Sequence, residues 1–171
     1  MKNNSLLLND PCCWAVVFVN PASGGVEANG AIATNAQLVR TAKYCEKNGL
    51  IIENAFISTG NDGLKPFNSM IGFIRSHDYK IAVVADTANS LFAYDFCKVS
   101  FLHGLFLQHE VEIHLVKEGI ILSHPYNSAE ERIWSNIRRI HSEHHGEIPK
   151  NISLIDGFIP TQKKSNVIKE K

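Results

Sequence analysis

The chain has 171 residues, of which 44% are apolar, and this composition suits one compact domain with a short tail. Its 17 basic and 17 acidic residues leave no net charge, which argues against non-specific nucleic-acid binding through an overall basic surface. The four cysteines fit neither a zinc motif nor a disulfide framework, and no apolar run reaches the length of a signal-peptide core or a membrane span. We therefore expect a cytoplasmic protein with reduced thiols.

The first predicted strand, residues 14–20, is a nearly continuous apolar run, which is typical of a strand covered on both faces. It ends at Pro21, which lacks the N–H needed to continue a ladder, and a glycine-rich loop follows. A helix comes next, with Thr34 or Asn35 as the expected N-cap and Gly49 as the residue that ends it. Residues 1–13 form an N-terminal extension.

A second strand–helix unit is predicted from residue 50 to about residue 75. The strand covers residues 50–57, and a turn-rich loop follows it. Pro66 occupies a position where the first turn of a helix tolerates proline. The helix should bury an apolar stripe at helical spacing, formed by Phe67, Met70, Ile71 and Ile74.

Residues 80–85 form a short, apolar strand that we expect at the centre of the sheet. Asp86 stands at its carboxyl end, where open α/β sheets place functional residues. One long helix is predicted from about residue 90 to residue 109, and the strand over residues 111–116 should lie near an edge of the sheet. The core-facing residues of the long helix are expected to be Leu91, Tyr94, Phe101, Leu105 and Phe106.

The last predicted helix begins at Ala129, after a capping-box pattern that starts at Ser128. Its apolar face could pack into the core of its own chain or could meet a second subunit. We take three residues of this face as the candidate oligomer surface: Trp134, Ile137 and Ile140. Residues 147–171 are broken by prolines and are expected to form a poorly ordered tail.

The order of these elements predicts a three-layer α/β domain over residues 14–146. Its centre should be a mostly parallel sheet of four or five strands, flanked by helices and followed by a long C-terminal helix. Functional residues of such a sheet are expected at the carboxyl ends of the strands.

The order of predicted elements and motifs over residues 14–145 resembles the catalytic domain of the serine site-specific recombinases, the resolvases and invertases. The segment Glu110-Val-Glu-Ile-His-Leu-Val-Lys-Glu118 is similar to the family's strand before its last helix. Gln37 matches a glutamine near the start of the family's first helix, and Lys65-Pro66 resembles an arginine-proline pair after a glycine-rich loop. The resemblance implies a resolvase-like fold, DNA as a partner, and self-association.

Most of the family's catalytic residues are replaced in this chain. Its first strand ends in an aromatic residue-x-Arg-x-Ser, and the aligned residues here put Asn20 at the arginine and Ala22 at the nucleophilic serine. After the central strand the family has Asp-Arg-x-x-Arg, of which only Asp86 is kept. Asp86 is therefore the candidate catalytic residue. The candidate DNA- or phosphate-binding residues are Asn20, Gln37, Lys65, Thr87 and Ser90.

These replacements predict a recombinase-like protein that has lost its chemistry. Phosphoryl transfer needs a positioned hydroxyl and cationic groups, and removal of one stabilising donor costs about 100- to 1,000-fold in rate. The expected role is regulatory, through self-association or pairing with an active recombinase. We predict no separate DNA-reading domain, because only about 25 residues follow the last predicted helix.

Two alternatives remain open. Ser23, one residue beyond the aligned position, could act as a shifted nucleophile in an active recombinase. The loop from Pro21 to Gly25 also resembles the phosphate-binding opening of the diacylglycerol kinase family, which would make the chain a phosphate- or small-molecule-binding domain.

The sequence predicts no metal site and no cofactor. His141 is spaced i, i+3 from His144 and i, i+4 from His145, and such a pair can hold a metal on one helix. No third strong ligand for the pair is identifiable in the sequence. We interpret them as a solvated helix end, where histidines face the negative pole of the helix dipole.

Overall fold

The computed structural model describes residues 12–21, 30–58, 64–92, 96–108, 110–123 and 128–143. These residues form a sheet of five strands in the order β2-β1-β3-β4-β5. The first four strands run parallel, and β5 returns antiparallel to β4. The predicted mostly parallel sheet is confirmed. The strands are β1 (Trp14–Val19), β2 (Ile51–Ile57), β3 (Ile81–Ala85), β4 (Val111–Leu115) and β5 (Ile120–Leu122).

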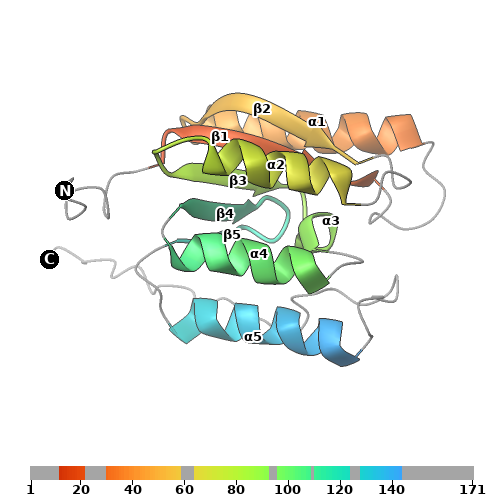
Figure 1. Ribbon diagram of the computed structural model, residues 1–171. Helices are drawn as coiled ribbons and strands as arrows, with labels where there is room; N and C mark the ends of the chain where they lie inside the picture. Colours follow the sequence, from red (N-terminus) through yellow and green to blue (C-terminus); the bar gives the residue numbers. More distant parts are fainter. Residues whose placement is uncertain are drawn as a thin grey trace, which may run out of the picture.

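Helices cover both faces of the sheet (Figure 1). In this view α1 (Gly30–Lys47) lies behind the sheet and α2 (Lys65–Arg75) lies in front of it, while α5 (Ser128–Glu143) packs against α4 (Phe96–Leu107). The α/β fold with flanking helices is therefore the predicted one. The helices are α1 (Gly30–Lys47), α2 (Lys65–Arg75), α3 (Ala88–Phe92), α4 (Phe96–Leu107) and α5 (Ser128–Glu143). Within the described residues, no helix is both long and apolar enough to cross a membrane.

The β3 strand is central and fully buried, as its sequence predicts. Val83 faces the larger core cluster, which includes residues of α2, α4 and α5, while Val84 faces the smaller cluster beneath α1. A strand with apolar neighbours on both faces must be apolar throughout, which explains the continuous run. β4 lies one strand in from the edge formed by β5, which agrees with its predicted place near an edge.

The first helix begins earlier than predicted and ends where predicted. α1 starts at Gly30, so Thr34 and Asn35 lie inside the helix and neither is its N-cap. The alanines before them are strong helix formers and extend the helix toward the N-terminus. Gly49 has φ of 67°, its N–H donates to the Glu46 carbonyl at 3.2 Å, and the N–H of Leu50 donates to the Cys45 carbonyl at 2.9 Å. This pattern is a Schellman motif, and it confirms Gly49 as the residue that ends the helix.

The second helix matches its prediction. Pro66 lies in the first turn of α2, where its missing N–H has no partner to lose. The predicted stripe of Phe67, Met70, Ile71 and Ile74 is buried against the sheet.

The single long helix predicted over residues 90–109 is wrong, because the structure has two helices there, α3 and α4. Leu91, Leu105 and Phe106 are buried as expected, and Tyr94 lies outside the described residues. Phe101 is 46% exposed, so its predicted core position is wrong. In a helix this apolar, spacing alone does not choose the buried face, and the core takes the stripe that starts at Leu102.

The last helix belongs to the core of its own chain. α5 begins at Ser128, one residue before the predicted start. Trp134 and Ile137 are fully buried, and the Trp134 ring lies 5.6 Å from the ring of Phe106. These two residues therefore do not form an exposed oligomer surface, and that expectation is corrected. The side chain of Ile140 lies outside the described residues.

Among the described residues, none of the cysteines Cys12, Cys13 and Cys45 forms a disulfide bond. Burial raises the pKa of Cys45 to about 11, which keeps this thiol protonated near neutral pH. Residues 1–11 and 144–171 lie outside the described part of the chain, so the N-terminal extension and the C-terminal tail stay predictions.

Candidate functional site

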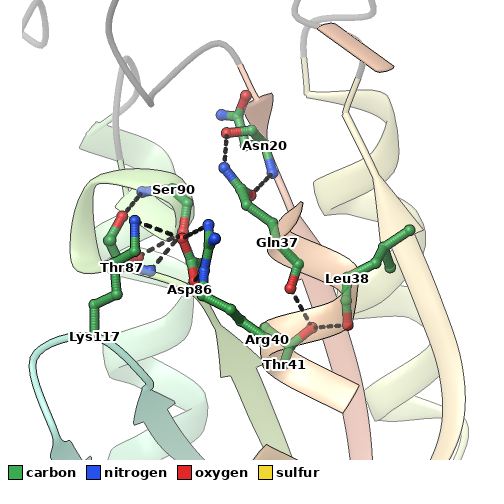
Figure 2. A network of polar contacts seen from close by, with 9 residues as sticks. All are labelled: Asn20, Gln37, Leu38, Arg40, Thr41, Asp86, Thr87, Ser90 and Lys117. Carbon is green, nitrogen blue, oxygen red and sulfur yellow. Dashed lines mark hydrogen bonds and ion pairs between the residues drawn. The ribbon is translucent and has the colours of Figure 1, made fainter. Parts of the chain in front are cut away.

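The candidate site lies where β1 and β3 end side by side. The chain connects β1 to β2 on one side and β3 to β4 on the other, so the order of strands reverses between β1 and β3. Open α/β sheets place ligand sites outside the carboxyl ends of the strands at such a point. Asn20 follows β1 and Asp86 follows β3, and both are buried. Figure 2 shows them with the residues of α1, α3 and the β4–β5 turn that approach them.

Gln37 of α1 holds the main chain at the end of β1. Its Oε1 accepts a hydrogen bond from the Asn20 N–H at 3.1 Å, and its Nε2 donates to the Asn20 carbonyl at 3.2 Å (Figure 2). Gln37 is buried, so both the oxygen and the nitrogen of its side-chain amide need hydrogen-bond partners. The structure thus brings together two sequence-predicted site residues, and it gives Gln37 a role in positioning the strand end.

Asp86 forms a bidentate ion pair with Arg40 of α1. The Arg40 Nε lies 2.6 Å from Asp86 Oδ1, and Nη2 lies 2.9 Å from Oδ2. Lys117 of the β4–β5 turn adds a third contact, with its Nζ 3.3 Å from Oδ2. The Asp86 side chain is only 2% exposed, so its charge is compensated by cations rather than by water. The hydrogen bond to Asp86 raises the pKa of Arg40, which stays charged.

Thr87 and Ser90 bind each other at the start of α3. The Thr87 N–H donates to Ser90 Oγ at 3.0 Å, and the Ser90 N–H donates to Thr87 Oγ1 at 3.0 Å (Figure 2). The Ser90 hydroxyl also donates to the Thr87 carbonyl at 2.7 Å. This reciprocal pattern has the form of a capping box, so both hydroxyls are used to begin the helix.

Glu118 is a second, half-buried carboxyl group beside the site. Its Oε1 accepts a hydrogen bond from the Ala88 N–H at 2.9 Å, in the first turn of α3. Burial raises the pKa of Glu118, and the nearby charge of Asp86 raises it further against the opposing hydrogen bond. Within the described residues its Oε2 has no hydrogen-bond partner.

The other predicted site residues are not part of this group. Lys65 is exposed at the start of α2, and within the described residues it forms no ion pair. Ala22 and Ser23, with the rest of the glycine-rich loop to Gly25, lie outside the described residues. The shifted nucleophile and the phosphate-binding loop therefore stay predictions. The described residues also contain no group of three or more side chains suited to a metal ion.

Sequence reasoning missed Arg40 and Lys117. Arg40 and Asp86 are 46 positions apart, so no local pattern links them. Arg40 does follow Gln37 by three residues, which places both on one face of α1. Had the residues on the same helix face as Gln37 been considered, Arg40 would have been among the candidate site residues.

Comparison with solved structures identifies the fold. The chain is similar to the N-terminal catalytic domain of TP901-1 integrase, with a TM-score of 0.59 and 17% identity, over 77% of this chain and 98% of that one. It is also similar to a resolvase family site-specific recombinase from Streptococcus pneumoniae, with a TM-score of 0.58 and 17% identity, over 78% of this chain and 90% of that one. The sequence matches no protein-family model and no curated protein. The chain therefore has the resolvase-like fold that its sequence predicts.

Proposed function

We propose that this resolvase-like chain acts in DNA recombination without catalysing strand exchange itself. The observation that carries this proposal is the state of Asp86, the one catalytic-motif residue kept after the central strand. Its carboxylate is buried, and both of its oxygens are held by Arg40. A general acid or base must reach the proton that it transfers, and Asp86 has no oxygen free for this task.

The remaining motif positions support the same conclusion. Thr87 and Ser90 stand where the recombinase family has arginines, and their hydroxyls cap α3. Asn20 stands at another arginine position, and its main chain is bound by Gln37. Neutral hydroxyl and amide groups stabilise the charge that develops on a phosphate during strand transfer less strongly than arginines do. Each lost donor of this kind costs about 100- to 1,000-fold in rate, so the combined loss removes the family's reaction.

The proposed role is regulatory, through association with DNA or with an active recombinase. A catalytic domain that keeps its fold can still occupy the place of an active subunit in an oligomer, and can thereby change the activity of its neighbours. The resolvase-like fold supports this role, because it preserves the shape of such a subunit.

A trap for the covalent protein–DNA intermediate tests the proposal. The purified chain is incubated with labelled DNA that carries the site of an active serine recombinase, alone and mixed with that recombinase, and adducts are separated on a denaturing gel. We expect no adduct on this chain and a changed adduct yield on the active recombinase. The Ser23→Ala variant serves as the matched control and should behave as the unmodified chain does.

Two results would contradict the proposal. An adduct on this chain that disappears in Ser23→Ala would show an active enzyme with Ser23 as its nucleophile. An unchanged adduct yield on the active recombinase, together with no co-purification and no DNA binding, would remove the link to recombination.

A further inference from the structure

A row of aromatic side chains lies near the amino ends of the strands, away from the candidate site. The ring centroids of Trp14 and Tyr79 are 5.9 Å apart, and the row continues from Tyr79 to His77 at 5.0 Å. His77 lies 4.3 Å from Phe73, which lies 5.9 Å from Phe56. We call these five side chains the aromatic band. Trp14 is the first of the six residues of β1, and the candidate site follows the last, so the two places are roughly 20 Å apart.

The aromatic band reaches the surface of the molecule. Trp14 is 36% exposed, and Ile51, its neighbour in the register of β1 and β2, is 54% exposed. Phe56, Phe73 and Tyr79 are half-buried and pack against the larger core cluster. Scattered exposed apolar residues are ordinary, but contiguous apolar surface rimmed by polar groups marks a place where another molecule binds.

An exposed carboxylate stands beside the aromatic band. The Tyr79 hydroxyl lies 2.9 Å from Oε1 and 2.8 Å from Oε2 of Glu53, a residue of β2. The hydroxyl donates one proton, whereas a carboxylate has about four acceptor positions, so most of those of Glu53 remain. Tyr79 therefore holds the carboxylate against the aromatic rings and leaves it able to accept further hydrogen bonds.

The charge around Tyr79 is negative. The pKa of Tyr79 is raised by desolvation, by its hydrogen bond to Glu53, and by the negative charges of Glu53 and Asp78. Both charged groups that act on the hydroxyl are carboxylates. A second carboxylate beside a phosphate would be repelled, so this surface does not suit the backbone of a nucleic acid.

Two basic residues border the aromatic band in the sequence, and both have other contacts. The Arg75 guanidinium lies over the ring of Phe101 on α4, 5.9 Å from its centroid. The Lys80 Nζ lies 2.7 Å from Oε1 of Glu112. Among the residues that the structure describes, Glu53 forms no ion pair. Aromatic faces and a carboxylate thus meet at one exposed place without a cation.

We propose that the aromatic band and Glu53 bind an arginine side chain of a partner protein. A guanidinium stacks on the faces of tryptophan and tyrosine, and its planar fork matches a carboxylate. Tyr79 contacts both the Trp14 ring and the Glu53 carboxylate, so a cation beside it meets an aromatic face and an opposite charge together. An apolar residue next to the arginine packs on the exposed Ile51. The partner is therefore a basic, partly apolar protein segment.

The inference goes beyond the proposed function, because it assigns a surface for protein contact whether or not the partner is a recombinase. A blocked synthetic peptide with one arginine between two leucines serves as the probe. It is titrated into the full chain and followed by the NMR signals of the Trp14 indole N–H and the Tyr79 amide N–H. A second peptide carries citrulline, which has nearly the shape of arginine but no charge.

The test variants change the carboxylate and the exposed ring separately. Glu53→Gln keeps an acceptor for the Tyr79 hydroxyl and removes the charge. Trp14→Leu removes the ring and keeps an apolar side chain. Glu143→Gln is the matched control, since Glu143 is an exposed glutamate on α5.

We expect the arginine peptide to bind the unmodified chain, and the citrulline peptide to bind about tenfold more weakly. Glu53→Gln should weaken binding of the arginine peptide about tenfold, since a charge-assisted hydrogen bond is lost. Trp14→Leu should weaken it about threefold, through loss of the cation–π contact. Glu143→Gln should bind as the unmodified chain does.

Four results would overturn the inference. They are no binding of the arginine peptide, equal binding of the arginine and citrulline peptides, unchanged affinity in Glu53→Gln, and binding of a single-stranded oligonucleotide that Trp14→Leu abolishes. The last result would make the band a nucleic-acid surface. Peptide binding together with an unchanged adduct yield on the active recombinase would support the band and count against the proposed function. A changed adduct yield without peptide binding would overturn the band and leave the proposed function standing.

Discussion

At the scale of single residues, the site is organised by partners that the chain brings together from distant positions. The side chain of Asp86 is buried, and Arg40 and Lys117 supply the polar contacts that water would otherwise supply. The same residue would be costly to bury without them. The candidate catalytic residue has thus become the anchor of an ion-pair network.

Glu118 gives the first prediction at this scale. Its raised pKa means that the folded chain holds the proton of this carboxyl group more tightly than the unfolded chain does. The stabilising contribution is therefore fully present below the ordinary pKa of 4.5 and is lost as the pH rises through the raised value. Glu118→Gln keeps the acceptor for the Ala88 N–H and carries no charge. We expect this variant to unfold at higher denaturant concentration than the unmodified chain at neutral pH.

The pH dependence supplies the check on that prediction. Denaturant unfolding at about pH 7 and about pH 4 should show the advantage of Glu118→Gln shrinking at the lower pH. Glu143→Gln is the control, since Glu143 is exposed and its pair with Arg139 on α5 contributes little. An advantage of Glu118→Gln that is equal at both pH values, or a loss of stability at neutral pH, would contradict the assigned pKa shift.

At the scale of elements, local signals were reliable where a few neighbouring residues decide the structure. Gly49 ends α1 and Pro66 lies in the first turn of α2, as predicted, because both effects depend on the backbone of one turn. The split between α3 and α4 was missed, since the sequence between Phe92 and Phe96 contains no glycine or proline that would signal a break. His114 lies on the face of β4 opposite to Ile113 and Leu115, in a strand whose alternating pattern suggests that this face is exposed. It is buried instead, and the hydroxyl of Tyr44, a residue of α1, lies 2.8 Å from its Nδ1.

A pair of glycine substitutions tests the helix assignments. Gly49→Ala should destabilise the chain by about 1 kcal/mol, because φ of 67° is unfavourable for a residue with a Cβ atom. Gly72→Ala, inside α2, should stabilise the chain by about 0.5–1 kcal/mol, since alanine favours a helix. Apart from its chain neighbours and the backbone of its own helix, no atom of the described residues lies within 4 Å of the added Cβ. Denaturant unfolding measures both changes. Effects of the same sign would contradict the end of α1 at Gly49 or the interior position of Gly72.

At the scale of the whole molecule, the two faces of the sheet are covered unequally. One core cluster lies beneath α1, and a larger one joins the sheet to α2, α3, α4 and α5. β3 lies in the middle of this arrangement and β2 at one edge, with most of its side chains exposed. The stability of the backbone should follow the same order.

Amide hydrogen exchange tests this order. We expect the amides of β3 to exchange most slowly, because they open only when the whole domain unfolds. The amides of β2 should exchange faster, since one side of this strand has no neighbouring strand in the described sheet. Equal protection of β2 and β3 would indicate that another segment or a second copy covers the β2 edge.

The sequence by itself determined the α/β class, the central strand, and the C-terminal ends of α1 and β3, because periodicity and turn chemistry are encoded within a few neighbouring residues. The resolvase-like fold was predicted from the resemblance of residues 14–145 to the serine recombinases. Tertiary structure alone decided which polar groups meet. The fork of Arg40 on Asp86 joins residues 46 positions apart, and the choice between core and interface for Trp134 depended on how α5 packs against α4. An amphipathic stripe specifies that a face is covered, but the partner that covers it is set by the packing of the whole chain.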